Sequence, residues 1–206
     1  MKHIIIAGCS RTGKTTLSNL LINKGYIHYQ MDLIKRAICK SFSLYENENW
    51  KSVSPKMADF ISQIINDPLV ETDTYKHCCI DTCHLYPKDI SRERLNNTIV
   101  LFLGYPNIDK KNKLLEIRKH DKKGVWTFNK SDKELLNNIE LAIRYSKEAK
   151  KQCESLGIPF FDTSFDFNKT IKDAYGYIES ELYKGDDKND ELERRKKFGK
   201  ENRFSI

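Results

Sequence analysis

A glycine-rich stretch near the N-terminus has the residue types and spacing that most directly imply chemistry. Gly8, Gly13, Lys14 and Thr15 fit the pattern G-x-x-x-x-G-K-[ST]. The stretch follows an apolar run and leads into a helix-forming segment, which is the context this pattern requires. The glycines let successive backbone N–H groups point toward one anion at a helix N-terminus. The sequence therefore predicts a phosphate-binding loop (P-loop) for a nucleoside triphosphate.

Within the P-loop, two side chains have expected roles of their own. Lys14 would reach the β- and γ-phosphates, and the Thr15 hydroxyl would bind the Mg²⁺ that bridges them. An incidental Lys-Thr after a glycine turn is the alternative, and the strand–loop–helix context argues against it. The predicted nucleotide-binding residues are Gly8, Cys9, Ser10, Arg11, Thr12, Gly13, Lys14, Thr15 and Thr16.

A carboxylate just after the second expected strand, 26–29, is a candidate catalytic base. Asp32 at this place would face the γ-phosphate and accept a proton from an attacking hydroxyl. Arg36, one helical turn further on, would share its face and hold an anionic group of the acceptor. The alternative is a helix N-cap aspartate followed by a solvated arginine. The spacing alone leaves both interpretations open.

The strand expected at 78–81 ends in a second carboxylate. Asp81 occupies the position of the second P-loop signature, where a carboxylate orients magnesium or its waters, although it could also simply cap the strand end. His84 follows in the turn and would line the acceptor site. A histidine in such a turn can equally serve as a packing or hydrogen-bonding residue.

The net charge of +7 is concentrated in one segment. Residues 109–133 carry nine Lys or Arg against four Asp or Glu. A basic surface can attract nucleic acid. Because no nucleic-acid-binding motif accompanies this charge, we favour a basic flap that covers a polyphosphate. Within it, Arg118 is the expected mobile arginine that closes on the transferring phosphate.

Expected strands and helices alternate along the chain, which predicts an α/β fold with a parallel sheet. We expect a three-layer α/β/α P-loop NTPase fold with a mainly parallel five-stranded sheet and ligands at the carboxyl ends of the strands. Residues 105–130 are too polar for a packed helix. The predicted divisions are a kinase-sized P-loop domain at 1–184, a helical acceptor-binding insertion at 31–75, a short lid at 105–130 and a charged flexible tail at 185–206. The expected strands are 3–7, 26–29, 78–81, 98–103 and 158–161, and the expected helices are 14–24, 31–38, 54–66, 131–156 and 168–184.

The composition fits one globular domain and excludes several classes. With 206 residues, 39% hydrophobic and 32% charged, the chain can bury a core and is not disordered. Its apolar runs are too short to span a membrane, and we see no signal peptide. Its six cysteines have no metal-like spacing. We therefore expect reduced thiols in a cytoplasmic protein with neither membrane nor nucleic acid as a partner.

The combined motifs resemble the adenylate kinase–shikimate kinase-like group. The likeness spans roughly 1–182 and rests on the P-loop, 31–36, 80–82 and Leu103-Gly104-Tyr105 before the basic flap. It implies an ATP- and Mg²⁺-dependent kinase that phosphorylates a hydroxyl or phosphate of a small molecule. Asp32 and Arg36 would then lie at the acceptor, Thr15 and Asp81 at magnesium, and the lid around Arg118. The stretch 81–87 lacks the arginine of adenylate kinases, which favours a different small-molecule kinase.

A guanine-binding switch protein is the main alternative. Asn129-Lys130-Ser131-Asp132 matches the N-K-x-D motif of Ras-like GTPases, and Asp81-Thr82 resembles the start of their D-x-x-G motif. Against this alternative, His84 stands at the glycine of D-x-x-G, and Ser131 has a simpler role as a helix N-cap. A non-catalytic nucleotide-binding protein remains a third interpretation. The sequence indicates no oligomeric state.

Overall fold

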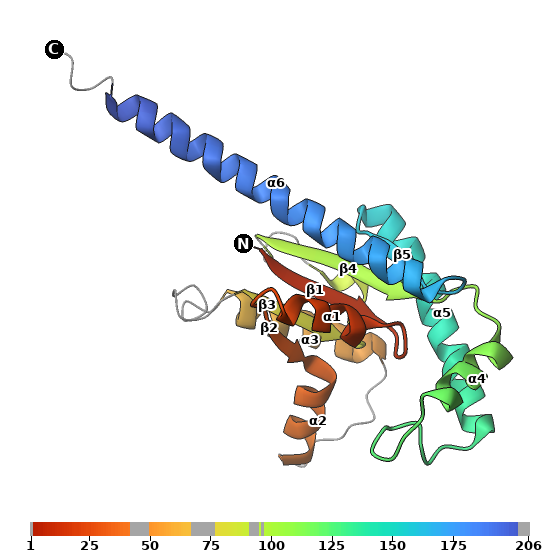
Figure 1. Ribbon diagram of the computed structural model, residues 1–206. Coiled ribbons are helices and arrows are strands. Elements are labelled where there is room, and N and C mark those ends of the chain that lie inside the picture. Colours follow the sequence, from red (N-terminus) through yellow and green to blue (C-terminus); the bar gives the residue numbers. More distant parts are fainter. Residues whose placement is uncertain (1, 42–49, 67–76, 91–94, 96, 202–206) are drawn as a thin grey trace.

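A five-stranded parallel sheet forms the centre of the molecule. The structure, a computed structural model, describes residues 2–41, 50–66, 77–90, 95 and 97–201 (Figure 1). The strand order is β2-β3-β1-β4-β5, and every neighbouring pair is parallel. This confirms the predicted sheet. The strands are β1 (His3–Gly8), β2 (Ile27–Gln30), β3 (Cys78–Thr82), β4 (Thr98–Gly104) and β5 (Phe160–Asp162).

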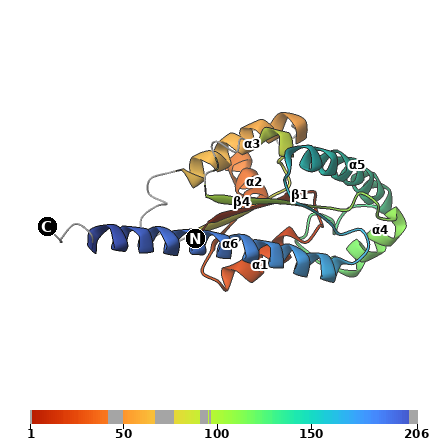
Figure 2. The same cartoon turned by 90° about the horizontal axis from the view of Figure 1, so that it is seen from above.

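Helices cover both faces of the sheet, so the predicted three-layer α/β/α architecture is confirmed. Figure 2 shows α1 and α6 on one face and α3 and α5 on the other. A short 3₁₀ helix, η2 (Pro87–Asp89), follows β3. The α-helices are α1 (Lys14–Ile22), α2 (Met31–Ser41), α3 (Trp50–Ile65), α4 (Lys110–Lys119), α5 (Asp132–Leu156) and α6 (Phe167–Glu201).

The central strand β1 is buried on both sides, which explains its unbroken apolar sequence. Successive side chains of a strand point to opposite faces. Ile4 and Ile6 pack with α1 and α6 in one core cluster, whereas Ile5 and Ala7 pack with α3 and α5 in the other. Continuous apolar strands of this kind are typical of a parallel sheet covered by helices.

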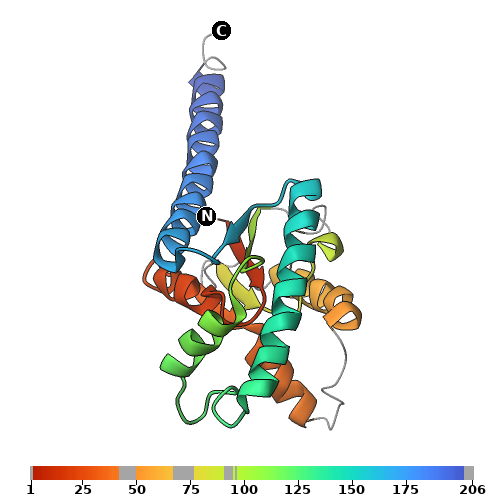
Figure 3. The ribbon, with the colours of Figure 1, turned by 90° about the vertical axis from the view of Figure 1, so that its right-hand side faces the viewer.

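The basic flap contains a helix that the sequence analysis did not predict. Residues 110–119 form α4, although this segment was expected to be too polar to pack. Asp109 caps the helix by accepting a hydrogen bond from the Asn112 N–H, 2.8 Å away. Ile117 packs against Leu135 and the rest of a small cluster on α5. Figure 3 shows α4 beside α5. A few buried positions on one face are therefore enough to hold a helix whose remaining surface is charged.

Two other helices have the boundaries that differ most from those expected. Helix α3 begins at Trp50, before the predicted start at Ser54, and contains Pro55. The buried Val53 and the Ser54 hydroxyl, which donates to Asp89, hold the turn ahead of the proline. Helix α6 continues to Glu201, beyond its predicted end at 184. In Figure 1 this helix extends beyond the sheet. The predicted domain divisions, including a tail at 185–206, stay predictions.

Cysteines contribute to the core as small apolar side chains. All six are free and buried. Burial raises the pKa of Cys78 to about 11 and that of Cys79 to about 12, so both thiols stay protonated at neutral pH. Among the helices that the structure describes, none has the length and apolar character needed to cross a membrane.

One glycine lets the P-loop leave β1 directly beside β4. Gly8 has φ +139°, and a Cβ atom added there would lie 1.9 Å from the carbonyl oxygen of Leu103. The two backbones pair at this point, because Gly8 is in register with Leu103. Any side chain would therefore force the strands apart at the entry to the loop.

We expect Gly8→Ala to lower the free energy of unfolding by about 3 kcal/mol or more, since a buried clash with backbone adds to an unfavourable φ. Urea unfolding measures this change. Gly176→Ala is the matched control, because Gly176 lies in α6 with open space around it. It should raise the free energy of unfolding by up to about 1 kcal/mol. Equal effects of the two substitutions would contradict the close approach at Gly8.

Candidate functional site

The predicted P-loop adopts a conformation suited to binding an anion. It connects β1 to α1, and three of its residues have positive φ: Gly8, Arg11 and Gly13. Gly13 precedes the first turn of α1 and makes no side-chain capping bond there, so no side-chain oxygen of the cap competes for the first N–H groups. Such a helix N-terminus attracts phosphate through its N–H groups and its dipole.

The P-loop lysine lies over the loop that it is expected to serve. Lys14 is buried, and its Nζ donates to the carbonyl oxygen of Cys9 at 2.8 Å. The Thr12 hydroxyl donates to the same carbonyl at 3.0 Å. Lys14 would exchange this carbonyl for the stronger charge-assisted bonds that phosphate oxygens offer.

The two residues predicted to bind magnesium lie together. The Thr15 hydroxyl donates to Asp81 Oδ2 at 3.1 Å, because β1 and β3 are neighbours and Asp81 lies near the carboxyl end of β3. His28 Nε2 lies 2.9 Å from the same oxygen, and only 8% of the His28 side chain is exposed. A hydroxyl and a carboxylate are ligands that suit Mg²⁺. Sequence analysis missed His28. The register of β2 on β3 pairs it with Cys79, two residues before Asp81, so the His28 and Asp81 side chains lie on the same face of the sheet.

The residues predicted to bind the acceptor line one cavity beside the P-loop. It has a volume of about 390 Å³ and includes Ser10 and Arg11 of the loop. Asp32, Arg36 and His84 all contribute to its wall, and their role in binding an acceptor stays a prediction. The remaining lining residues are Lys35, Cys39, Cys83, Tyr105, Ile117, Trp126, Lys130, Leu135, Asn138, Ile139, Leu141 and Ala142.

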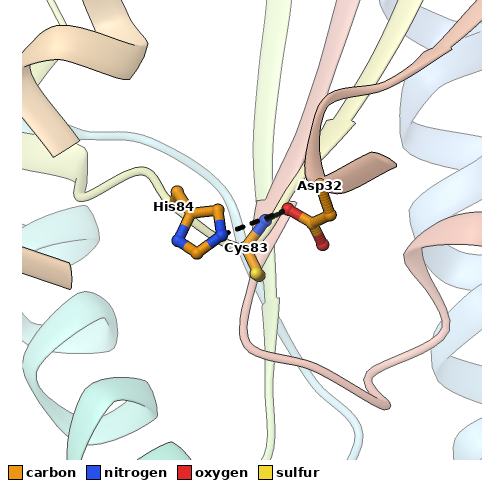
Figure 4. Close-up of side chains that lie close together, drawn as sticks. All are labelled: Asp32, Cys83 and His84. Atoms are coloured by element: carbon orange, nitrogen blue, oxygen red, sulfur yellow. Dashed lines mark hydrogen bonds and ion pairs between the residues drawn. The ribbon is translucent and has the colours of Figure 1, made fainter. Parts of the chain in front are cut away.

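The Asp32 carboxylate is held from one side. Its Oδ1 accepts a hydrogen bond from the Cys83 backbone N–H at 3.0 Å and lies 3.8 Å from His84 Nε2 (Figure 4). Burial lowers the pKa of His84, although the charge of Asp32 opposes this shift, so the imidazole is neutral at pH 7. Burial and then the charge of Asp32 raise the pKa of the Cys83 thiol. The hydrogen bond from the Cys83 N–H therefore fixes one carboxylate oxygen of Asp32 in the cavity wall that His84 also lines.

Arg118 lies in the segment predicted to be a lid, 105–130, and does not line the cavity. Its guanidinium donates to Asp132 Oδ1 at 2.6 and 2.9 Å, to Asp121 Oδ2 at 3.0 Å and to the Lys130 carbonyl at 2.7 Å. The hydrogen bonds to Asp132 and Asp121 raise its pKa. In this conformation Arg118 stabilises the lid itself, and its role in closing on phosphate stays a prediction.

A buried lysine of the lid supports the P-loop, which the sequence analysis did not predict. Lys113 Nζ donates to the carbonyl oxygen of Arg11 at 2.8 Å and to Glu116 at 2.9 Å. The Tyr105 hydroxyl donates to the carbonyl oxygen of Ser10 at 3.1 Å, and the Lys113 ammonium lies 4.7 Å from the Tyr105 ring centre. Two consecutive loop carbonyls are thus held by side chains that follow β4.

The Arg11 side chain makes the reverse connection, from loop to lid. Its Nη2 donates to the Thr127 hydroxyl at 2.6 Å and lies 3.7 Å from Asp121. Thr127 is fully buried and donates in turn to Asp121. Arg11 has φ +63°, a conformation that is unfavourable for any residue with a Cβ. The lid contacts offset this strain.

Three solved structures to which the chain is similar are named as kinases. The chain is similar to a shikimate kinase from Bacteroides thetaiotaomicron (TM-score 0.49, 16% identity, 88% of this chain and 98% of that one). It is also similar to a gluconokinase from Sinorhizobium meliloti 1021 (0.48, 14%, 88% and 95%). A third is a deoxyadenosine kinase from M. mycoides with bound dATP (0.41, 16%, 87% and 100%). No protein-family model and no curated protein sequence matches the chain. The fold is therefore defined by the strand order and by the P-loop between β1 and α1, both of which lie in the described residues.

The guanine-binding alternative receives no support from the structure. The segment before Asn129 forms turns, and Ser131 caps α5 in a reciprocal capping box with Glu134. Asp132, which would have to contact the base, instead accepts hydrogen bonds from Arg118. The N-K-x-D match is therefore the capped start of a helix.

Because Arg11 combines a strained φ with lid contacts, two substitutions separate these effects. Arg11→Gly and Arg11→Ala both remove the bonds to Thr127 and Asp121, but only alanine keeps a Cβ at φ +63°. We expect Arg11→Gly to be more stable than Arg11→Ala by about 1 kcal/mol. Paired urea unfolding experiments measure the difference. An alanine variant at least as stable as the glycine variant would show that residue 11 does not have positive φ.

Proposed function

We propose that this chain is an ATP-dependent kinase that transfers the γ-phosphate to a hydroxyl or phosphate group of a small molecule. The observation that carries the proposal is a cavity that starts at the P-loop and has a fixed carboxylate in its wall, Asp32. A P-loop alone accounts for triphosphate binding. A second site directly beside it, with a group able to accept a proton, is what phosphoryl transfer to an acceptor additionally requires.

The nucleotide would be held by residues of the P-loop. Backbone N–H groups at the start of α1 would bind phosphate oxygens, and Lys14 would move from the Cys9 carbonyl to the β- and γ-phosphates. Thr15 and Asp81 would hold Mg²⁺, and their hydrogen bond supports a shared ligand at this place. When bound, Mg²⁺ neutralises charge that develops between the β- and γ-phosphates. His28 would keep the Asp81 carboxylate oriented.

Asp32 would act as the general base toward an acceptor hydroxyl. The Cys83 N–H fixes Oδ1, so the carboxylate does not need to reorient when substrate binds. The cationic groups of the wall, Lys35 and Arg36 among them, favour an acceptor that carries an anionic group. The apolar side of the cavity, which includes Trp126 and Ile139, would contact the body of that molecule.

Arg118 would complete the site only after the lid rearranges. It would have to leave Asp132 and Asp121, and phosphate oxygens would replace those carboxylates as acceptors. A cytoplasmic location and a set of partners limited to nucleotide and small molecule stay predictions from the sequence.

The experiment that tests the function is a screen with γ-labelled ATP. The purified chain is incubated with MgATP and a panel of hydroxylated acids, phosphorylated sugars and nucleosides, and labelled products are identified. Lys14→Ala is the paired variant, and we expect it to remove productive MgATP binding while the fold is retained. If Lys14→Ala leaves both turnover and MgATP affinity unchanged, the assigned role of the P-loop is wrong.

Once an acceptor is known, Asp32→Asn tests the base. We expect kcat to fall roughly 10²–10⁴-fold with little change in nucleotide affinity, because asparagine is nearly isosteric but cannot accept the proton. Asp173→Asn, at an exposed carboxylate of α6, is the control and should leave kcat unchanged. A normal kcat with a raised acceptor KM would instead assign Asp32 to substrate binding.

A further inference from the structure

Three side chains of different donor chemistry meet at the wall of the acceptor cavity. The ligand atoms of Asp32, Cys83 and His84 all lie within 4.8 Å of one another. Figure 4 shows Asp32 and His84 on either side of Cys83. They meet because β2 and β3 are neighbouring parallel strands: Asp32 follows the end of β2, and the other two follow the end of β3.

This combination of donors differs from that of the expected magnesium site. Thiolate sulfur and imidazole nitrogen bind Zn²⁺ and similar ions well, whereas Mg²⁺ prefers oxygen ligands and octahedral geometry. Bond lengths of about 2.0–2.3 Å place the ligand atoms of a tetrahedral Zn²⁺ site about 3.3–3.8 Å apart. For an oxygen and a nitrogen ligand the expected separation is about 3.3–3.4 Å. The 3.8 Å between Asp32 Oδ1 and His84 Nε2 is therefore somewhat longer than in a site with bound metal. Small side-chain rotations would bring all three atoms to bonding distance.

The surroundings favour a site with one open position. Cys83 is buried, and the Asp32 and His84 side chains are 34% and 15% exposed, so all three are partly shielded from water. All three also line the cavity. Three protein ligands on a cavity wall leave the fourth position of the metal to water or to a bound molecule.

We propose that Asp32, Cys83 and His84 form a binding site for a thiophilic divalent cation of the Zn²⁺ class, separate from the magnesium site at Thr15 and Asp81. Binding replaces the Cys83 thiol proton, which is released to solvent, by a sulfur–metal bond. A second consequence rests on the proposed function: the cation occupies the Asp32 carboxylate, so it prevents that group from accepting the acceptor's proton. The bound cation therefore inhibits phosphoryl transfer.

Co²⁺ is the probe, because a thiolate bound to Co²⁺ gives a charge-transfer absorption that Mg²⁺ and oxygen ligands do not produce. The full chain, with thiols reduced and Mg²⁺ in excess, is titrated with Co²⁺. We expect one equivalent to bind with a thiolate band that Zn²⁺ abolishes by displacement. Cys83→Ser should remove the band, and His84→Gln should weaken binding roughly tenfold or more.

Cys39→Ser is the matched control, because Cys39 lines the same cavity but is not part of the cluster. It should keep the thiolate band. Circular dichroism and thermal unfolding establish that each variant folds. A band that persists in Cys83→Ser, or Co²⁺ binding without any thiolate band, would overturn the proposal.

Inhibition is measured separately, so that the two proposals can fail independently. If a labelled product is found, Zn²⁺ should lower kcat in the unmodified chain and have much less effect on Cys83→Ser. A Cys83-dependent Co²⁺ band in a chain that phosphorylates nothing would support the cation site and count against the kinase. An active kinase without the band would support the kinase and overturn the cation site.

Discussion

The phosphate loop depends on a place where two backbones meet with no side chain between them. Gly8 lies against the Leu103 carbonyl, and this contact fixes where the chain leaves the sheet. The exit point from the sheet in turn determines the direction of the loop, the start of α1 and the position of Lys14. Parallel pairing of β1 with β3 then brings Asp81 to Thr15, and pairing of β3 with β2 brings Asp32 to Cys83. One steric constraint and one strand order thus position the whole site.

The parts predicted from the sequence were those that follow from local pattern and strand order. The P-loop has a fixed spacing, and the carboxyl ends of parallel strands share one edge, so Asp32, Asp81 and His84 could be assigned to that edge. Lys113 and His28 could not. Lys113 donates to the backbone carbonyl of Arg11. Because every residue has such a carbonyl, no sequence pattern distinguishes a lysine that is buried against one from a lysine in solvent. His28 required the register of an edge strand, which the sequence does not determine.

The lid illustrates how little apolar surface a helix needs when its polar groups have partners. Helix α4 buries Ile117 and the stem of Lys113, and the Lys113 ammonium is satisfied by a carbonyl, a carboxylate and an aromatic ring. Burying a charge without such partners would be strongly unfavourable. The sequence analysis missed α4 because a search for hydrophobic periodicity counts a buried lysine as a polar residue. The same contacts join the lid to the loop, so the position of one constrains the conformation of the other.

Because β1 is buried on both faces, the P-loop that follows it can form only together with the rest of the sheet. Its hydrogen-bonding partners, β3 and β4, lie far along the chain, and its side chains need helices from both layers. Closing such long segments loses chain entropy before any contact compensates for it. The first strand and the loop it carries therefore acquire their shape only with the sheet as a whole, never as an isolated N-terminal unit. If the loop binds a triphosphate as proposed, the ligand would stabilise the folded domain as a whole, including residues that it never touches.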